Sequence, residues 1–314
     1  MILAGIDEAG LGPPLGPLVT ARAVLETPDG WEPDRPWTAL SGSVVKRPEK
    51  GDPRLVVDDS KAVHARRGLA GLERTTAAFC AVAGAGKPPV EWADVDDGVS
   101  DDAYPWYHGF LEPFPAIIAE DERTRIQSAL RRDLAAVGAS VLELAVRVAG
   151  PLCLNRRFSS GDNKNQALLR ETGRHIDLAS RLAAGGAAMI VVDKQGGRNN
   201  YLPFLSTLFP GKWIFTEKEG AAGSTYRLSS EGCGLTIHFL PKADALSFPT
   251  ALASMAAKYI RERAMAAFNL WFGRRVENLA PTAGYPQDAK RWLREAEAYL
   301  SRSGLDRDRI VRRR

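Results

Sequence analysis

The stretch from Met1 to Leu25, MILAGIDEAGLGPPLGPLVTARAVL, holds two apolar runs on either side of a loop rich in glycine and proline. The first run, Met1–Asp7, has the composition of a strand and ends in acid, and Leu18–Leu25 resumes as a second strand. Gly10–Pro17 must turn the chain, because glycine and proline interrupt regular structure. We therefore expect a β-hairpin at the start of the chain rather than a βαβ unit.

Further strands and helices are predicted in mixed order over the rest of the chain. We expect strands at residues 141–148, 188–193, 211–216, 224–228 and 235–240. We expect helices at residues 65–83, 119–137, 163–184, 201–209, 249–270 and 287–302. This order predicts the α/β or α+β class, built around a mixed sheet. The length fits one large domain with insertions, or two small ones, and we expect a single domain over residues 1–314.

Composition and size are those of an ordinary globular protein, with 314 residues and a formal net charge of +4. No apolar run reaches the roughly 20 residues of a membrane helix, and the N-terminus lacks the basic start of a signal peptide. Cys80, Cys153 and Cys233 lie far apart, which favours buried thiols in a reducing compartment over disulfides. With only four histidines, a His-based zinc site is not expected. We therefore expect a cytoplasmic protein without membrane contact, in which carboxylates would bind any metal.

Charge is spread unevenly along the chain. Glu91–Glu122 holds ten acidic residues and neither Lys nor Arg, within a segment of about residues 88–122 that we interpret as an insertion. Lys258–Arg314 holds 14 basic and 7 acidic residues, a net charge of +7, and we interpret it as a C-terminal basic helical segment. A basic portion of this kind suits a polyanionic partner, although a solvated helix face with a charged tail would look the same.

Acidic residues fall where predicted strands end. Asp7 and Asp193 each close a strand, Asp244 follows another by a few residues, and Glu8 adjoins Asp7. Sites in open α/β sheets form at the carboxyl ends of strands, so these acids are able to converge; each is equally typical of a helix cap or a turn. Four clustered carboxylates need a counter-charge, which Mg²⁺ or Mn²⁺ supplies. Two such ions activate water and stabilise the leaving oxygen in phosphodiester hydrolysis.

Longer motifs surround these acids. The stretch GIDEAGLGP at residues 5–13, followed by Gly16-Pro17, resembles the opening signature of the type 2 ribonucleases H, ribonuclease HII. Further segments resemble this family in the family's own order: Asp59–Lys61, Ile190–Asp193, Lys242–Ser247 with Ala251–Arg263, Gly284–Pro286 and Ile310–Arg313. The resemblance spans nearly the whole chain.

The resemblance implies a fold, a reaction and a partner. The fold would be a ribonuclease H-like mixed β-sheet flanked by helices, with a C-terminal helical segment. Asp7, Glu8, Asp193 and Asp244 would hold two Mg²⁺ or Mn²⁺ ions. The enzyme would hydrolyse the RNA strand of RNA/DNA hybrids, or ribonucleotides embedded in DNA, and leave 5′-phosphate and 3′-hydroxyl ends. Such an activity would contribute to DNA repair.

The same resemblance implies a substrate-binding surface. Its residues would be Gly10, Leu11, Gly12, Lys61, Lys242 and Tyr285. The glycine turn would present backbone amides to the nucleotide at the RNA–DNA junction, since glycines allow a backbone to approach a sugar-phosphate closely. Tyr285 would stack on a sugar there, unless it is a core aromatic. The two lysines would contact phosphate or neutralise the acids, unless they are ordinary surface lysines.

Three departures from the family's pattern concern substrate choice. Leu11 stands where the family usually has Arg, and Ala243 and Leu246 replace Gly and Lys around Asp244. The third departure is the acidic insertion, which we expect to face away from the substrate or to contact a basic partner. Two alternatives therefore stay open: a non-cleaving nucleic-acid-binding protein, and a nuclease with another substrate such as a DNA junction.

Other polar residues have plainer interpretations. Arg198 follows Asp193 in a glycine-rich loop and would hold either a phosphate or the loop itself. Lys258 would reach a phosphate or an internal carboxylate. We expect packing or surface roles for His175, His238, Ser254 and Met255.

Overall fold

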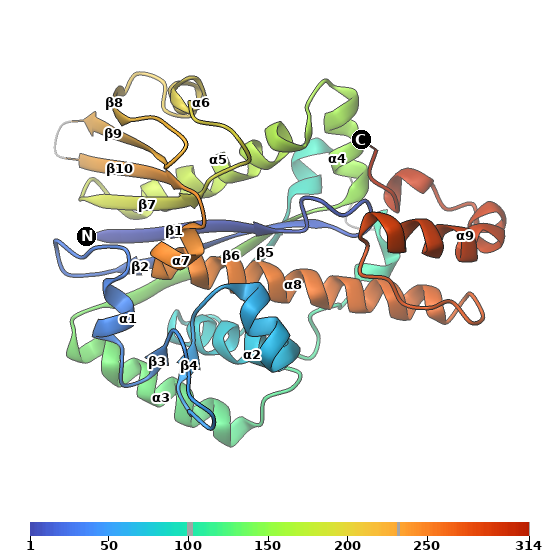
Figure 1. The fold of residues 1–314 in the computed structure, drawn as a ribbon, viewed down its shortest axis with the longest axis horizontal. Coiled ribbons are helices and arrows are strands. Elements are labelled where there is room, and N and C mark those ends of the chain that lie inside the picture. Colours follow the sequence, from blue (N-terminus) through green and yellow to red (C-terminus); the bar gives the residue numbers. More distant parts are fainter. Residues whose placement is uncertain (99–102, 231–232, 314) are drawn as a thin grey trace.

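An eight-stranded mixed sheet forms the centre of the structure, which is a computed structural model describing residues 1–98, 103–230 and 233–313 (Figure 1). The strands lie in the order β5-β6-β2-β1-β7-β10-β9-β8. Their bounds are β1 Ile2–Ala9, β2 Leu18–Glu26, β5 Val90–Trp92, β6 Ser140–Ala149, β7 Ala188–Asp193, β8 Trp213–Lys218, β9 Ser224–Ser230 and β10 Cys233–Leu240. Two short strands, β3 Val44–Val45 and β4 Leu55–Val56, form a separate pair.

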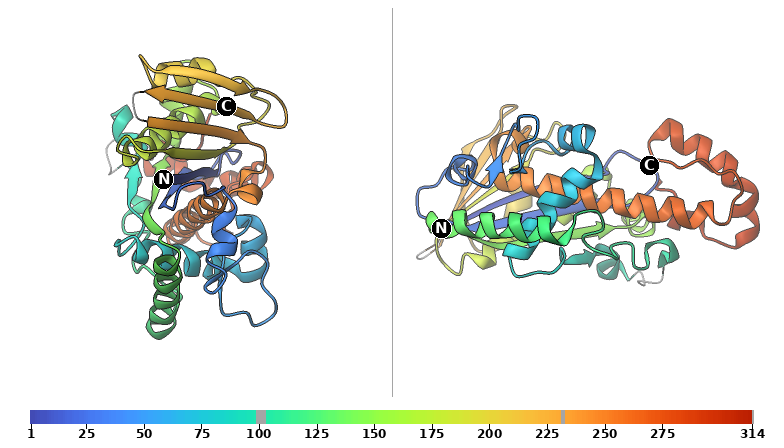
Figure 2. Two further views of the ribbon diagram at one scale, coloured as in Figure 1. Left: turned by 90° about the vertical axis from the view of Figure 1, so that its left-hand side faces the viewer. Right: turned by 90° about the horizontal axis from the view of Figure 1, so that it is seen from below.

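Helices cover both faces of this sheet. They are α1 Arg35–Ala39, α2 Ser60–Val82, α3 Glu120–Ala136, α4 Pro151–Ser159, α5 Lys164–Leu182, α6 Leu202–Leu208, α7 Ala243–Leu246, α8 Phe248–Gly273 and α9 Pro286–Ser303. Short 3₁₀ turns are η1 Ala93–Asp97, η3 Pro105–Tyr107 and η4 Arg307–Arg309. Helix α8 runs along one face and continues beyond the sheet to α9, while α5 lies on the other face (Figures 1 and 2). This confirms the expected mixed sheet flanked by helices, with a C-terminal helical segment.

The central strands bring distant parts of the chain to one edge. Strand β1 pairs antiparallel with β2, as the predicted hairpin requires, and parallel with β7. Strand β10 also runs parallel to β7. Because Ile6 lies opposite Val192 in this parallel pair, Asp7 and Asp193, the next residue on each strand, lie beside one another. The register therefore places two of the predicted acids together.

Helix α8 packs directly on the hairpin because small residues line the contact. A Cβ atom on Gly5 would lie only 2.0 Å from the backbone nitrogen of Thr250, so any larger residue would push α8 away from β1. Residues 251–257 of α8 are all buried. Ser247 begins the helix, and its hydroxyl accepts a hydrogen bond from the Thr250 amide at 3.4 Å. The helix that follows Asp244 is thus held firmly against the strand that carries Asp7.

Some elements differ from the sequence-based expectation. Helix α2 begins at Ser60, earlier than residue 65, because the Asp59 carboxylate accepts a hydrogen bond from the Ala62 amide at 2.7 Å and caps it. Its backbone leaves the helical conformation at Gly68, where φ is +62°. Helix α4 was not expected, since it is only nine residues long and depends on burying Cys153 and Leu154.

The acidic segment, over its described residues, is folded into the molecule. Strand β5 extends the sheet beside β6, and Trp106 packs on Phe268 and Phe272 of α8. Several of its acids pair with basic residues of the same chain: Glu91 and Asp96 with Arg147, Glu112 with Lys87, and Glu122 with Arg74. These acids are therefore compensated within the chain, and the expectation that the segment faces away from the substrate or contacts a basic partner stays a prediction. Asp101 and Asp102 lie outside the described residues.

Cysteines and hydropathy agree with the expectation where the structure describes them. Cys80 and Cys153 are buried thiols that take part in no disulfide among the described residues. Among the described residues, no helix combines the length and the apolar character needed to cross a membrane.

Candidate active site

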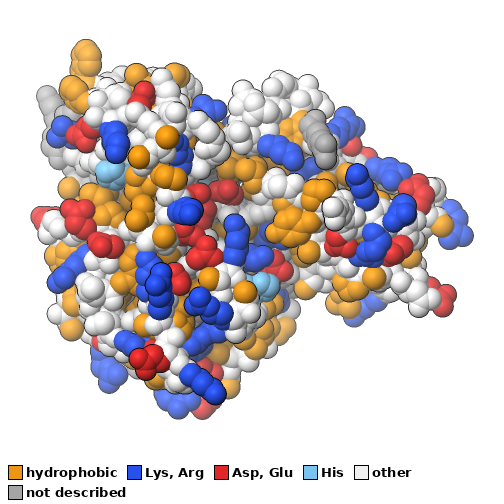
Figure 3. Space-filling view, in the orientation of Figure 1, with side chains coloured by type: hydrophobic (Ala, Val, Ile, Leu, Met, Phe, Trp, Pro, Cys, Tyr) orange, Lys and Arg blue, Asp and Glu red, His pale blue; other side chains and the backbone are white. Residues whose placement is uncertain are grey.

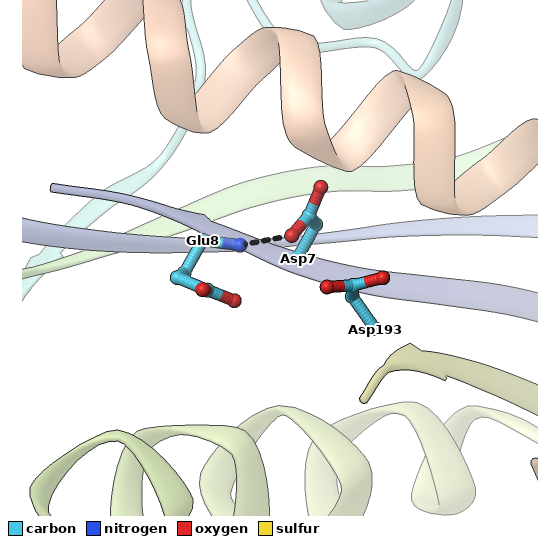
Figure 4. A group of neighbouring side chains, drawn as sticks. All are labelled: Asp7, Glu8 and Asp193. Carbon is cyan, nitrogen blue, oxygen red and sulfur yellow. Dashed lines mark hydrogen bonds between the residues drawn. The ribbon is translucent and has the colours of Figure 1, made fainter. Parts of the chain in front are cut away.

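Three carboxylates meet where β1 and β7 end. One oxygen each from Asp7, Glu8 and Asp193 lies within 4.8 Å of the other two. Figure 4 shows these side chains grouped on neighbouring strands, where the Glu8 amide donates a hydrogen bond to Asp7 Oδ1 at 2.7 Å. The structure thus brings together three of the four predicted acids.

Crowding and burial change the proton affinity of these groups. Burial, followed by repulsion from Glu8 and Asp193, raises the pKa of Asp7 well above its ordinary value. Burial and repulsion from Asp193 raise the pKa of Glu8 to about 7. Burial also raises the pKa of Asp193. Within the described chain, none of the three forms an ion pair with Lys or Arg. Lys61 lowers the pKa of Glu8 and of Asp193 by its charge but, in the part of the chain that the structure describes, forms no ion pair with either, so the three acids remain short of positive charge. Such hard oxygen ligands fit a divalent cation such as Mg²⁺ or Mn²⁺.

Asp244 lies in the same cleft but outside this group of three. It belongs to α7, which is tied to β7 because the Ala243 amide donates to Asp193 Oδ1 at 2.9 Å. Burial, then the neighbouring carboxylates of Asp59 and Asp193, raise the pKa of Asp244. The N-cap residue of α2, Asp59, therefore adds a fifth acid to the cleft. Its motif was noted in the sequence, but the residue was not predicted as part of the site.

The cleft has a volume of about 600 Å³. Besides the acids, its walls include every residue predicted to bind substrate: Gly10, Leu11, Gly12, Lys61, Lys242 and Tyr285. Figure 3 shows acidic side chains in the middle of this face of the molecule, with Lys and Arg side chains around them. The arrangement places negative charge where cations would bind and positive charge where a polyanion would enter.

Tyr285 stands at the mouth of the cleft with 53% of its surface exposed, at the start of α9. The alternative interpretation as a core aromatic is therefore wrong. The guanidinium of Arg261 lies 5.8 Å from the centre of its ring, which fits a weak cation–π contact. An exposed, flat ring supported from one side is able to stack on a sugar or base.

Two residues of α8 belong to the cleft although the sequence did not single them out as site residues. Ser254 was interpreted as core; it is buried, contacts the hydroxyl of Ser60 at 3.0 Å and lowers the pKa of Asp7 by a hydrogen bond. Arg261 lies under the glycine turn, where a Cβ on Gly10 would come within 2.5 Å of its Nε. The spacing of residues 254, 258 and 261 was the available signal, because it puts these three polar residues on one face of a helix that is mostly apolar.

The remaining candidates fall in different places. Lys258 lines the cleft and contacts Glu262 at 2.6 Å, so it reaches a carboxylate on its own helix. Arg198 does not line the cleft and lies against the ring of Tyr201. The other three have packing roles: His175 is buried between Thr20 and Arg22, His238 contacts Thr225, and Met255 is in the core.

Among the known proteins compared with this chain, resemblance is found to solved structures and not to family models or curated sequences. No protein-family model matches the chain, and no curated protein matches its sequence. A chain in the structure of the PCNA:RNase HII complex from Archaeoglobus fulgidus is 18% identical over 100% of this chain and 95% of that chain, with a TM-score of 0.45. Ribonuclease H2 from Pyrococcus horikoshii is 16% identical over 99% and 92%, with a TM-score of 0.43. Bst-RNase HIII in complex with Mn²⁺ is 18% identical over 99% and 66%, with a TM-score of 0.41.

Proposed function

We propose that this protein is a metal-dependent endoribonuclease that hydrolyses the RNA strand, or embedded ribonucleotides, of RNA/DNA duplexes. One observation carries the proposal: a cluster of unpaired carboxylates lies at the floor of a cleft whose walls hold a glycine turn, lysines and an exposed tyrosine. The floor suits divalent cations, and the walls suit a phosphodiester backbone with its sugars. The order of motifs that resembles ribonuclease HII supports the choice of substrate.

The acids of the floor are the groups that would hold metal. Asp7, Glu8 and Asp193 would bind one Mg²⁺ or Mn²⁺ ion, and Asp244 beside Asp59 would complete the ligands of a second. When bound, the two ions supply an activated water and stabilise the leaving 3′ oxygen. The products would carry 5′-phosphate and 3′-hydroxyl ends.

The walls of the cleft would orient the nucleotide. Lys61 and Lys242 would contact phosphate, and the backbone of the turn at residues 10–12 would approach the ribose and its 2′-hydroxyl. Tyr285 would stack on the sugar of the neighbouring nucleotide. Removal of ribonucleotides from DNA by these groups would be a DNA repair reaction.

Cleavage of a defined duplex tests this proposal. The substrate is an end-labelled DNA duplex with one embedded ribonucleotide, incubated with Mg²⁺ or Mn²⁺ and, separately, with a chelator. We expect metal-dependent cleavage 5′ of the ribonucleotide, cleavage of an RNA/DNA hybrid, and an intact all-DNA control. Binding without cleavage would favour a non-cleaving paralogue, and cleavage of the all-DNA duplex would favour a nuclease with another substrate.

A further inference from the structure

The end of the described chain reaches back to the glycine turn of the cleft. Val311 forms a β-bridge with Leu15, and the Arg312 amide donates to the Pro14 carbonyl at 2.9 Å. Asn155 of α4 fixes this end, because its side chain binds the Val311 carbonyl at 2.8 Å and the Arg313 amide at 2.6 Å. The last residues therefore form a strap beneath residues 10–17.

The side chain of Arg312 is buried in this strap and binds only backbone oxygens. Its Nε donates to the Gly16 carbonyl at 2.9 Å, and its Nη1 donates to the Gly10 carbonyl at 2.5 Å. Only 5% of Arg312 is exposed, and no carboxylate pairs with it among the described residues. Burying a guanidinium without a carboxylate is costly, which favours a role beyond packing for Arg312.

The contact with Gly10 fixes the direction of the next amide. The Gly10–Leu11 peptide bond is trans, so its carbonyl and its N–H point in opposite directions. Since the carbonyl points to Arg312, the Leu11 N–H points away from Arg312, and residues 10–12 line the cleft. Within the described chain, that N–H has no hydrogen-bond partner.

We propose that Arg312 is a positioning residue: by holding the Gly10 carbonyl, it presents the Leu11 amide to an oxygen of the substrate nucleotide. The acceptor is either a phosphodiester oxygen or the ribose 2′-hydroxyl, both of which accept from an N–H. This inference rests on the proposed function, because it requires a nucleotide in the cleft. Arg261, which pairs with Glu262 at 3.5 Å, places a second buried guanidinium next to the same turn.

Binding to uncut duplexes tests the role of Arg312. In an Asp193→Asn background, affinities are measured for an all-DNA duplex and for the same duplex with one ribonucleotide. Arg312→Gln should weaken binding about 10-fold, the size of one hydrogen bond to substrate. A loss on both duplexes would identify phosphate as the acceptor, and a loss on the ribonucleotide duplex alone would identify the 2′-hydroxyl. Arg313→Gln is the matched control: it removes the same charge one residue away from an exposed side chain, and we expect no loss.

A double-mutant cycle separates positioning from general destabilisation. Leu11→Pro removes the N–H itself, so it should cost as much as Arg312→Gln, and the combination should cost no more than either change. Arg312→Lys, which reaches one carbonyl at most, should recover part of the loss. Should Arg312→Gln fail to fold, as judged by circular dichroism, the cycle is run with Arg312→Lys. Additive losses, or a loss no larger than that of Arg313→Gln, would overturn the inference, whereas failure of the parent protein to bind any duplex would overturn the proposed function instead.

Discussion

Two groups of carboxylates in this molecule differ in how their charge is compensated. Around Arg147, the carboxylates of Glu91, Asp96 and Glu171 each lie 2.7 to 2.8 Å from a guanidinium nitrogen. Arg157 adds a second partner for Glu171 at 2.7 Å. This group is saturated by its own chain, and it joins the acidic segment to the sheet and to α5.

At the ends of β1 and β7, by contrast, the acids repel one another. Asp7, Glu8 and Asp193 share a small space without an ion pair, and their pKa values are raised. A protein keeps such a destabilising group when an external cation completes it. The comparison shows that the number of acids in a segment is a poor guide to function. The acids that the chain leaves unpaired are the informative ones.

The largest effect we expect separates the two groups by activity. Asp193→Asn removes a metal ligand from the unpaired group but no phosphate donor, so it should lower cleavage by roughly three orders of magnitude while duplex binding changes little. Glu91→Gln, the control from the paired group, should retain cleavage within about threefold. Turnover rates of the two variants on the single-ribonucleotide duplex give the answer. Wild-type turnover in Asp193→Asn would contradict the assignment of these acids.

In metal-free protein, neutralising an acid should raise the free energy of unfolding in the unpaired group and lower it in the paired group. Because the pKa of Glu8 is about 7 in the folded protein and lower when unfolded, the folded state binds its proton more tightly. Metal-free protein should therefore lose stability as the pH rises from about 4.5 through about 7. Glu8→Gln should remove this loss and stabilise the protein by about 1–3 kcal/mol at pH 8, with no gain at pH 4.5.

The paired group supplies the control for that experiment. Glu171→Gln removes the buried carboxylate that Arg147 and Arg157 share, so it should destabilise the protein by about 3 kcal/mol. Urea unfolding in the presence of a chelator, at pH 4.5 and pH 8, measures both variants. Destabilisation by Glu8→Gln at pH 8 would mean that the acids of the cleft are already compensated.

Tyr285 extends the comparison from the floor of the cleft to its wall. Tyr285→Ala should lower kcat/KM about 10–100-fold on a duplex with a single embedded ribonucleotide, through loss of stacking. The loss on a continuous RNA/DNA hybrid should be smaller, because a continuous RNA strand offers other registers. Trp213→Ala is the matched control, since Trp213 is 79% exposed but does not line the cleft. Equal losses on every substrate would argue against reading of the junction by this ring.

The smallest expected effect concerns Leu11, the apolar residue at the turn. Leu11→Arg should raise cleavage several-fold at low salt by adding a phosphate contact, and the gain should fall as salt screens that contact. Initial rates at low and physiological ionic strength measure it. A gain that is independent of salt would point to a change in the turn itself rather than to a new charge.

Much of the fold and the core of the site could be predicted from local sequence. The hairpin, the strand ending at Asp193 and the long helix after Asp244 have clear apolar patterns, and parallel strands bring their carboxyl ends together. This is why the meeting of Asp7, Glu8 and Asp193 was foreseeable. Helix α4 was missed because its short, mixed sequence depends on tertiary packing.

Contacts between the chain's distant parts could not be predicted. Asp59 comes close to Asp244 only because α2 packs beside α7 and α8. The strap that carries Arg312 beneath the turn joins residues almost 300 positions apart, for which the sequence holds no local signal. In the acidic segment, composition did not reveal that Arg147 and other basic residues of the same chain compensate several of its acids.

Calorimetric titration with Mg²⁺ and Mn²⁺ at neutral pH tests the central claim most directly, that the unpaired acids form a metal site and the paired acids do not. For the wild-type protein we predict saturable binding accompanied by proton release, visible as a dependence of the measured heat on the buffer, because carboxylates with raised pKa give up protons to the metal. Asp193→Asn should abolish this binding and Glu91→Gln should preserve it. Saturable binding that survives Asp193→Asn unchanged, or no saturable binding by the wild-type protein, would contradict the account.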